Sequence, residues 1–389
     1  MLPSIFILAL LQASTINAAA ANPFPAGPFP VGPFPADVNK KPVSFGSSIP
    51  VNFATPTPVP AEGAAQPGGK KDEKPNNPKP ENPKPNNPKP ANPTPTPSVP
   101  IVPAPGVPAN SSTGVPAIEG FTLTWSDEFK GADGSLPDSK NWIIDVGTSY
   151  PGGPANWGTG EIQTYTNKPE NVQVVNGQLK ITAIGKDKTW TSARVETQRT
   201  DFMAQEGKKM IIQASIAMPD VTGPEAIGYW PAFWTLGGNY RGVFTNWPGV
   251  GEFDIMENVN GLNKVTGVLH CDVAPGGRCN EMDGIGKNLQ CPGKPCQGNL
   301  HTYTLTVDRS ATPETMTWSV DGQKYHSITE QELGAQLWTQ TVQHGHFILL
   351  NLAMGGAFPN KVHGADTPLP GTVSGKSLNI DYVAVYNSI

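Results

Sequence analysis

Residues 172–183 read V-Q-V-V-N-G-Q-L-K-I-T-A, two short runs of largely alternating side chains on either side of an Asn-Gly pair. Alternation with a period of two indicates β-strands, because successive side chains of a strand point to opposite faces. Asn176 and Gly177 tolerate the positive φ angles that a two-residue hairpin turn requires. The segment predicts a β-hairpin.

The same period recurs along the chain from Phe121 onward. It appears at 301–307, at 317–325 around an Asp-Gly pair, and at 378–386, whereas 347–353 is almost wholly apolar and suits a strand buried on both faces. Helical periodicity is fair only at 329–338. Many strands without an internal repeat favour an all-β sandwich of two large antiparallel sheets.

Proline divides the 389-residue chain into two parts. Of 43 prolines, 27 lie between residues 22 and 116, and 15 lie in the 272 residues from 118 to the end. Pentapeptide repeats, PFPAG-PFPVG-PFPAD at 23–37 and KPNNPKPENPKPNNPKPANP at 74–93, occupy the first part. Dense proline fixes φ and removes backbone donors. We expect a disordered linker at 21–117, serving as a plain stalk or contacting a cell wall through its lysines, and a folded domain at 118–389.

Residues 1–20, MLPSIFILALLQASTINAAA, have the layout of a secretory signal peptide. The apolar core of about nine residues is too short to span a bilayer, and we expect no other membrane span. The sequence predicts secretion to the extracellular space or the cell wall. Asn110-Ser111-Ser112 is an N-glycosylation sequon that fits this compartment.

Four cysteines fall within 26 residues: Cys271, Cys279, Cys291 and Cys296. Their spacing, C-x7-C-x11-C-x4-C, matches the usual zinc-ligand spacings poorly. Their even number favours two disulfides within one long loop. Three connectivities are open, of which 271–279 with 291–296 is the most local.

Charge also differs between the two parts of the chain. Residues 22–117 hold 8 Lys and 5 acidic residues, a net charge of +3, and the remainder holds 19 Lys and Arg and 27 Asp and Glu, a net charge of −8. Neutralisation of phosphates drives nucleic-acid binding. An acidic domain without a basic stripe therefore argues against a nucleic-acid partner.

The segment 251–258 reads G-E-F-D-I-M-E-N and places three carboxylates among residues that favour burial. Glu252 and Asp254 share a strand face, whereas Glu257 would point to the opposite face of a regular strand. A β-bulge, one extra residue in the strand, restores the shared face. We expect a bulge near residues 255–256 that brings all three carboxylates onto one surface.

The separation of the two glutamates suggests their use. Four regular strand steps span about 13 Å, and two glutamates that lean together each cover about 4 Å of it. The remaining gap of about 5 Å is close to the carboxylate spacing of retaining glycosidases. Asp254 would hydrogen-bond the nucleophile and help to hold the two pKa values apart. A solvated strand face and a calcium site are the alternatives.

This segment resembles the E-x-D-x-x-E signature of glycoside hydrolase family 16, in its laminarinase-like branch of endo-1,3(4)-β-glucanases, as a secreted enzyme of fungal type. Further segments resemble the family in its own order: WSDEFKG at 125–131, NWGTGEIQTYT at 156–166, NVQVVNGQL at 171–179, TSARV at 191–195, YWPAFWTLG at 229–237 and DYVAVY at 381–386. The resemblance covers residues 121–386 and implies a concanavalin A-like β-jelly-roll sandwich.

The resemblance also assigns roles. Glu252 would be the nucleophile, Asp254 its hydrogen-bonding partner, and Glu257 the general acid/base of a double displacement. The extra residue Met256 is typical of enzymes that cleave β-1,3-glucan, whereas strict lichenases and fungal wall transglycosylases lack it. Five further residues would contact sugar: Trp234, Trp247, Trp230, Arg194 and His270. Indole faces suit the apolar faces of sugar rings, and a guanidinium suits their hydroxyls; core packing, an ion pair and a polar filler are the respective alternatives.

Two features depart from the family. Many laminarinases read W-G-N-N-E where this chain reads W-G-T-G-E at 157–161, so two amides that would contact glucose are missing. The cysteine-bearing loop after His270 is not general to the family. Glu128 and Asp381 resemble positions from which some members bind a structural calcium, and no catalytic cofactor is implied.

These observations predict a secreted, monomeric, retaining endo-β-glucanase. It would hydrolyse internal β-1,3 bonds of a β-glucan polysaccharide, with some action on mixed β-1,3-1,4-glucan. A wall-glucan transglycosylase is the enzymatic alternative, because a sugar can intercept the covalent intermediate. A lectin-like binding protein is the non-catalytic alternative, and it would not need Glu252 and Glu257 together.

Overall fold

The computed structural model describes residues 114–389. The expected signal peptide, the proline repeats and the Asn110 sequon lie outside the described residues. The domain limits at residues 20 and 117 therefore remain predictions.

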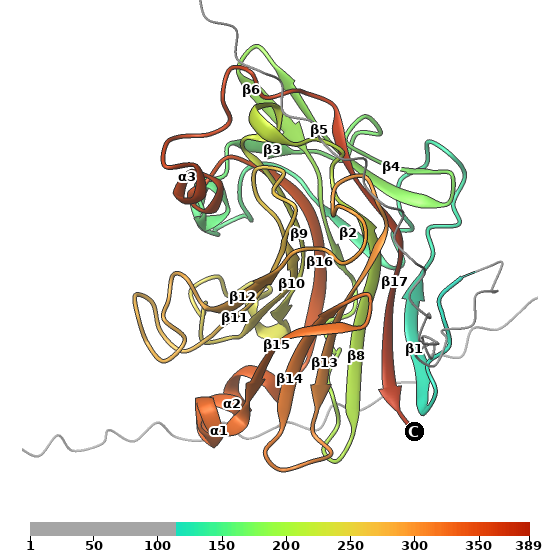
Figure 1. Cartoon of the computed structure of the whole chain (residues 1–389), viewed down its shortest axis with the longest axis vertical. Helices are drawn as coiled ribbons and strands as arrows, with labels where there is room; N and C mark the ends of the chain where they lie inside the picture. The colour runs from blue at the N-terminus through green and yellow to red at the C-terminus, as the bar shows by residue number, and fades with distance from the viewer. Residues whose placement is uncertain (1–113) are drawn as a thin grey trace, which may run out of the picture. The chain divides into compact units, whose positions relative to one another are not determined.

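The described residues form a sandwich of two β-sheets, as predicted (Figure 1). The larger sheet has ten strands: in order, β15 (Gln323–Thr329), β14 (Thr315–Val320), β13 (His301–Asp308), β8 (Lys209–Ala217), β17 (Lys376–Ser388), β5 (Gln178–Lys186), β6 (Thr189–Ser192) and β3 (Gln163–Tyr165), with β1 (Phe121–Asp127) beside β17 and β4 (Val172–Val175) beside β5. The smaller sheet has seven strands: in order, β12 (Ile285–Leu289), β11 (Val265–His270), β10 (Glu252–Glu257), β9 (Tyr229–Gly237), β16 (His346–Met354), β7 (Arg194–Thr197) and β2 (Trp142–Asp145).

The hairpins read from the sequence are present. β4 and β5 meet at Asn176 and Gly177, whose φ angles are 52° and 72°, and β14 and β15 meet at Asp321 and Gly322, with φ angles of 48° and 78°. Positive φ at both central residues gives the two-residue turn whose twist matches the flanking strands. β16 is buried along its whole length, as its apolar sequence predicts.

All strand pairs but one are antiparallel within the described residues, and the exception is β3 with β6. Residues 163–165 and 189–192 are too short and too far apart in sequence for their pairing direction to be read from alternation. The expectation of purely antiparallel sheets is therefore corrected at this edge of the larger sheet.

Helices are few, and the one expected helix is divided in two. α1 (Glu330–Leu333) and α2 (Ala335–Val342) replace a continuous helix over 329–338, because Gly334 has φ 85° and ends the first. Thr329 caps α1 through a capping box with Glu332. The short α3 (Ala357–His363) was not predicted. The described residues also contain three 3-10 turns: η1 (Ala155–Gly158), η2 (Gly223–Ala226) and η3 (Gly238–Tyr240).

The core fills the space between the sheets and fixes the position of β10. Phe253, Ile255 and Met256 are buried in it, and the indole N–H of Trp318 on β14 donates to the backbone carbonyl of Asp254 at 2.8 Å. Gly251 directly precedes the strand with φ 80°, where a Cβ would lie 2.6 Å from the carbonyl oxygen of Thr341. Only glycine avoids both strains at this position.

Candidate active site

β10 carries a bulge at the expected residues. Opposite β9, Asp254 pairs with Trp234 and Met256 pairs with Phe233, so Ile255 has no partner. Opposite β11, the register also shifts between Asp254 and Glu257. The extra residue returns Glu257 to the face occupied by Glu252 and Asp254.

The three carboxylates consequently line one cleft on the outer face of the smaller sheet, while the three apolar residues between them face the core. The cleft has a volume of about 320 Å³. The two faces of β10 therefore have different roles. The apolar face packs into the core between the sheets, and the acidic face lines the cleft.

An indole holds each glutamate. Trp247 Nε1 donates to Glu252 Oε2 at 2.9 Å, and Trp230 Nε1 donates to Glu257 Oε1 at 2.8 Å. Glu252 is half-buried and Glu257 is buried. Each hydrogen bond fixes one carboxylate oxygen and leaves the second oxygen for other chemistry.

Burial and the nearby Asp254 carboxylate raise the pKa of Glu252 and of Glu257, each to about 8. The indole hydrogen bonds and the His270 cation act in the opposite direction. The groups titrate together, so removing one proton makes the next harder to remove. The cluster therefore holds its protons to higher pH than isolated glutamates would.

His270 lies beside Asp254 and favours Glu252 as the ionised partner. Its Nε2 is 3.3 Å from Asp254 Oδ2, and a carboxylate oxygen of Glu252, a carboxylate oxygen of Asp254 and a ring nitrogen of His270 all lie within 4.8 Å of one another. Burial alone would lower the pKa of His270. The contacts with Asp254 and Glu281 and the charge of Glu252 raise it by more, so that it lies well above its ordinary value. The imidazole is therefore a cation beside Glu252.

Aromatic side chains form most of the remaining cleft wall. These are Tyr150, Trp157, Trp230, Trp234, Tyr240, Phe244 and Trp247. Tyr150 stacks on Phe244 with ring centroids 4.8 Å apart and contacts Trp157 edge-on at 4.9 Å. Flat apolar rings edged by N–H and O–H groups are suited to sugar rings, whose C–H faces are apolar and whose rims are polar.

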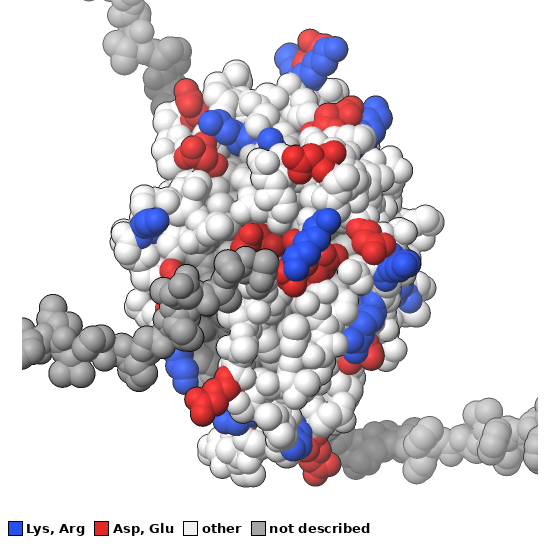
Figure 2. All heavy atoms as spheres, turned by 90° about the vertical axis from the view of Figure 1, so that its right-hand side faces the viewer, with Lys and Arg blue, Asp and Glu red and all other residues white. Residues whose placement is uncertain are grey.

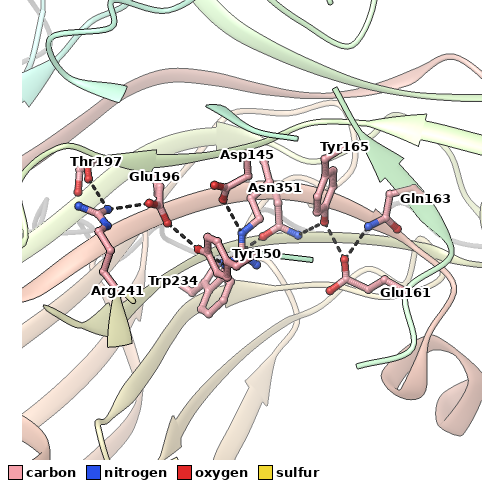
Figure 3. A network of polar contacts seen from close by, with 11 residues as sticks. Asp145, Tyr150, Glu161, Gln163, Tyr165, Glu196, Thr197, Trp234, Arg241 and Asn351 are labelled. Atoms are coloured by element: carbon pink, nitrogen blue, oxygen red, sulfur yellow. Dashed lines mark hydrogen bonds and ion pairs between the residues drawn. The ribbon is translucent and has the colours of Figure 1, made fainter. Parts of the chain in front are cut away.

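Arg194 is buried among these rings. Its Nε donates to Asp145 at 3.0 Å and its Nη2 donates to the hydroxyl of Tyr150 at 2.9 Å, and its guanidinium carbon lies 4.5 Å from the centre of the Trp157 ring. Figure 3 shows this network continuing through Glu196 to Arg241. The buried ion pair fixes the guanidinium in the wall between Trp157 and Trp234.

A second chain of hydrogen bonds orients Trp234 (Figure 3). Trp234 Nε1 donates to Asn351 Oδ1 at 2.7 Å, Asn351 Nδ2 donates to the hydroxyl of Tyr165 at 3.1 Å, and that hydroxyl donates to Glu161 at 2.8 Å. Glu161 also accepts from Gln163 and from Thr159. Every donor in the series has an acceptor, so the indole plane is fixed.

Known proteins match this fold and this site. Residues 162–303 match a family model described as "XgeA-like, catalytic GH16 domain". A solved endo-1,3-beta-glucanase from Streptomyces sioyaensis is 46% identical, covers 71% of this chain and 99% of its own, and superposes with a TM-score of 0.69. A glucan endo-1,3-beta-glucosidase from Cryptopygus antarcticus is 31% identical over 256 residues, 61% of this chain and 82% of the relative. The chain belongs to glycoside hydrolase family 16.

Another family 16 relative is longer. The glucan endo-1,3-beta-glucosidase A1 of Niallia circulans is 28% identical over 294 residues, which are 70% of this chain. The chain spans 38% of that relative's length.

Seven of the eight residues that the sequence assigned to catalysis and sugar binding in a family 16 site line the cleft: Glu252, Asp254, Glu257, Trp230, Trp234, Trp247 and Arg194. The eighth, His270, lies opposite Glu252 on the same face of the sheet, but it is not among the residues that line the cleft. Its ring nitrogens face Asp254 and Glu281, and its ring lies 5.7 Å from that of Trp247. Sugar contact and a polar filler therefore both remain predictions for His270.

Several cleft residues were not predicted. Tyr150, Tyr240, Phe244, Met282 and Asn351 come from loops or distant strands, and their sequence surroundings carry no motif. Glu161 and Trp157 lie in the W-G-T-G-E segment, which resembles a segment of the family. That motif could have predicted their place in the cleft, whereas the sequence around the loop residues could not.

The four cysteines form the most local of the three pairings, Cys271–Cys279 and Cys291–Cys296. The first disulfide begins directly after β11, at the end where Glu252 lies. α3 follows β16 at the opposite end, beside Glu257, and Phe358 on α3 packs edge-on against Trp230 with ring centroids 5.9 Å apart. In Figure 1 both α3 and the loops beside β11 and β12 project from the smaller sheet.

An ion pair joins these two walls. Lys361 Nζ on α3 lies 2.5 Å from Asp283 Oδ1, next to Met282 in the cleft wall. Because the two elements leave opposite ends of the strands, this contact crosses the cleft. Both side chains are largely exposed, so the contact is a weak and salt-sensitive link.

The predicted calcium site has less support than the cleft. Glu128 pairs with Lys130 at 2.7 Å, and Asp381 lies at a register shift of β17, with no contact joining the two acids among the described residues. Within residues 114–389, the group with metal-ligand spacing is Glu252, Asp254 and His270. That trio belongs to the acidic cluster of the cleft, and we assign no metal to it. Structural calcium remains a prediction.

The surface bears on the expected partners. On the face seen in Figure 2, basic and acidic side chains of the described residues are intermixed rather than gathered by sign. Among the described residues, no helix has the length and apolarity to cross a membrane.

Proposed function

We propose that this protein hydrolyses internal β-1,3 bonds of a β-glucan with net retention at the anomeric carbon. The observation that supports it best is the bulge of β10, which brings Glu252 and Glu257 to one cleft, each under an indole hydrogen bond. The substrate comes from the relatives, which are described as endo-1,3-beta-glucanase and glucan endo-1,3-beta-glucosidase.

The first step forms a glycosyl-enzyme. An ionised oxygen of Glu252 attacks the anomeric carbon, and Glu257 donates its proton to the glycosidic oxygen as that bond breaks. The leaving chain departs with a new hydroxyl. The cation at His270 and the indole N–H of Trp247 stabilise the charged form of Glu252 before the attack.

The second step releases the sugar. Glu257, now ionised, takes a proton from water, and the resulting oxygen attacks the same anomeric carbon as the bond to Glu252 breaks. Two inversions give retention. Asp254 keeps the proton on the cluster through its negative charge, since that charge raises the pKa of both glutamates.

The compartment is also a proposal. Two disulfides suit an oxidising environment, and the expected signal peptide at residues 1–20 agrees with secretion. Action on mixed β-1,3-1,4-glucan is part of the proposal, and the relative from Rhodothermus marinus, which is 30% identical to this chain, has the name "Beta-glucanase", which specifies no linkage.

The test compares laminarin, lichenan and xyloglucan side by side with the full chain. Release of reducing ends is expected to be fastest on laminarin and slower on lichenan. Proton NMR of the first products of laminarin oligosaccharides should show the β-anomer before mutarotation. An initial α-anomer, or a preference for xyloglucan, would overturn the proposal, and products longer than the substrate would assign transfer instead of hydrolysis.

A further inference from the structure

Glu281 is a buried acid that belongs to no strand and does not line the cleft. One carboxylate oxygen, Oε2, lies 2.7 Å from His270 Nδ1, and the other, Oε1, accepts the backbone N–H of Cys271 at 2.8 Å. Both oxygens thus contact the end of β11, directly behind the carboxylate cluster. A buried carboxylate is costly unless each oxygen has such a partner.

The Cys271–Cys279 loop holds this acid in place. The disulfide closes the loop two residues before Glu281, and the backbones of Gly276 and Glu281 exchange two hydrogen bonds. The loop therefore folds back on itself and returns Glu281 to the residue that follows His270. The backbone N–H of Arg278 also donates to Asp272 Oδ2 at 2.7 Å, so a hydrogen bond closes the loop together with the disulfide.

His270 transmits this position to the cleft. Its second ring nitrogen, Nε2, faces Asp254 Oδ2 at 3.3 Å. Its ring lies 5.7 Å from Trp247, whose indole N–H holds Glu252. One imidazole thus contacts both the central aspartate and the partner of the proposed nucleophile.

We propose that Glu281 is a positioning residue for glycosidic bond cleavage: through His270 it fixes Asp254 and Trp247, and the Cys271–Cys279 loop exists to hold it there. This inference rests on the proposed function of the cleft. Its physical basis is a carboxylate–imidazole–carboxylate series, in which each ring nitrogen faces one acid and the imidazole cannot turn without losing both contacts.

The charges around His270 agree with this role. Three acids face it, Glu281 from the loop and Glu252 and Asp254 from β10, and all three raise its pKa. Removing the Glu281 charge would weaken the hydrogen bond at Nδ1, which with the Asp254 contact at Nε2 keeps the imidazole protonated and aligned. Glu252 would then lose part of the positive charge that favours its ionised form.

The test uses Glu281→Gln in the full chain, with Glu206→Gln as the matched control, an exposed acid outside the cleft. The amide has nearly the same shape but no charge. We expect kcat on laminarin oligosaccharides to fall about tenfold, with KM within about twofold of wild type, because a misplaced group costs chemistry more than binding. The acidic limb of the pH–rate profile should move to higher pH, because a less cationic His270 favours the ionised form of Glu252 less. The control should change neither.

NMR titration of the His270 ring separates the two proposals, because it needs no substrate. The midpoint should fall in Glu281→Gln relative to wild type. An inactive wild type with this shift intact would refute the proposed function but keep the contact. Unchanged kcat and pH profile in Glu281→Gln, or an equal loss in Glu206→Gln, would overturn the positioning role.

The disulfides provide a second matched comparison should Glu281→Gln fold poorly. The double variant Cys271→Ala with Cys279→Ala should reproduce the loss of kcat. The double variant Cys291→Ala with Cys296→Ala should keep the wild-type kcat when the two double variants have equal thermal stability. Equal activity in the two double variants would contradict the role given to the first loop.

Discussion

Glu252 and Glu257 are five positions apart on one strand, yet both line the same cleft, because Ile255 is left unpaired opposite β9. In a regular strand, that odd spacing would bury one of the carboxylates in the core. The bulge at Ile255 therefore brings the two acids together. The other residues of the site influence the protonation of these acids and the sugar that the cleft binds.

The raised pKa of Glu257 makes stability depend on pH. A carboxyl with a pKa of about 8 in the folded protein and an ordinary value of 4.5 binds more protons folded than unfolded between these values. Stability should therefore fall as pH rises from 5 to 8. In Glu257→Gln this part of the loss disappears, so its Tm at pH 8 should exceed that of wild type by about 2–4 °C. Scanning calorimetry at both pH values measures it.

Glu206→Gln serves as the control for that comparison, since Glu206 is exposed and outside the cleft. Its Tm should follow wild type at both pH values. A Glu257→Gln variant that is no more stable than wild type at pH 8 would show that burial does not raise this pKa.

Trp247→Phe tests the hydrogen bond to Glu252. Phenylalanine keeps most of the ring but lacks the donor, so the ionised carboxylate loses stabilisation and its pKa rises. We expect the acidic limb of the kcat/KM profile to move to higher pH and kcat to fall about tenfold, the loss of one hydrogen bond to a charge. Trp125→Phe, outside the cleft, is the control. Identical pH profiles for the two variants would refute the assignment.

Arg194→Lys tests the aromatic wall. Lysine keeps the charge beside Asp145 but cannot reproduce the planar stacking against Trp157 and Trp234 or the fork to Tyr150. KM for laminarin oligosaccharides should rise about tenfold, with a smaller change in kcat. Arg199→Lys, in an exposed ion pair with Asp201, should leave both unchanged. A change in kcat alone would place Arg194 in the chemical step instead.

Lys361→Ala removes the ion pair that crosses the cleft. Because the pair is exposed, the free energy of unfolding should change by less than about 1 kcal/mol. The opened cleft should raise activity on β-1,6-branched laminarin relative to a linear β-1,3-glucan, and high salt should do the same for wild type. Lys130→Ala, which removes the exposed pair with Glu128, is the control. An unchanged substrate ratio would mean that the link does not obstruct the substrate.

Local sequence was enough for the sheets and the acids. Alternation and Asn-Gly or Asp-Gly pairs predict the hairpins, since strand period and turn geometry are short-range properties. The bulge followed from the need to bring Glu257 to the face of Glu252. The helix divided at Gly334 and the short α3, which contains Pro359, have too little periodicity for their first and last residues to be predicted from sequence.

The supporting residues could not be predicted in the same way. Asn351 meets Tyr165 across 186 positions of sequence, and Glu281 meets His270 only after a disulfide loop folds back. Such contacts depend on strand order and loop closure. His270 was expected at the sugar, and the register of β10 and β11 places it opposite Glu252 on the same face of the sheet, next to the residues that line the cleft.

The role of Glu252 can be tested by trapping the covalent intermediate. A 2-deoxy-2-fluoro laminaribiosyl fluoride slows both steps at the anomeric carbon but keeps a good leaving group, so the glycosyl-enzyme should accumulate. Peptide mass spectrometry should then find one added 2-deoxy-2-fluoro-laminaribiosyl group, a disaccharide, on Glu252, with none in Glu252→Gln. A label on a different residue, or an unlabelled enzyme that still cleaves laminarin, would contradict the account.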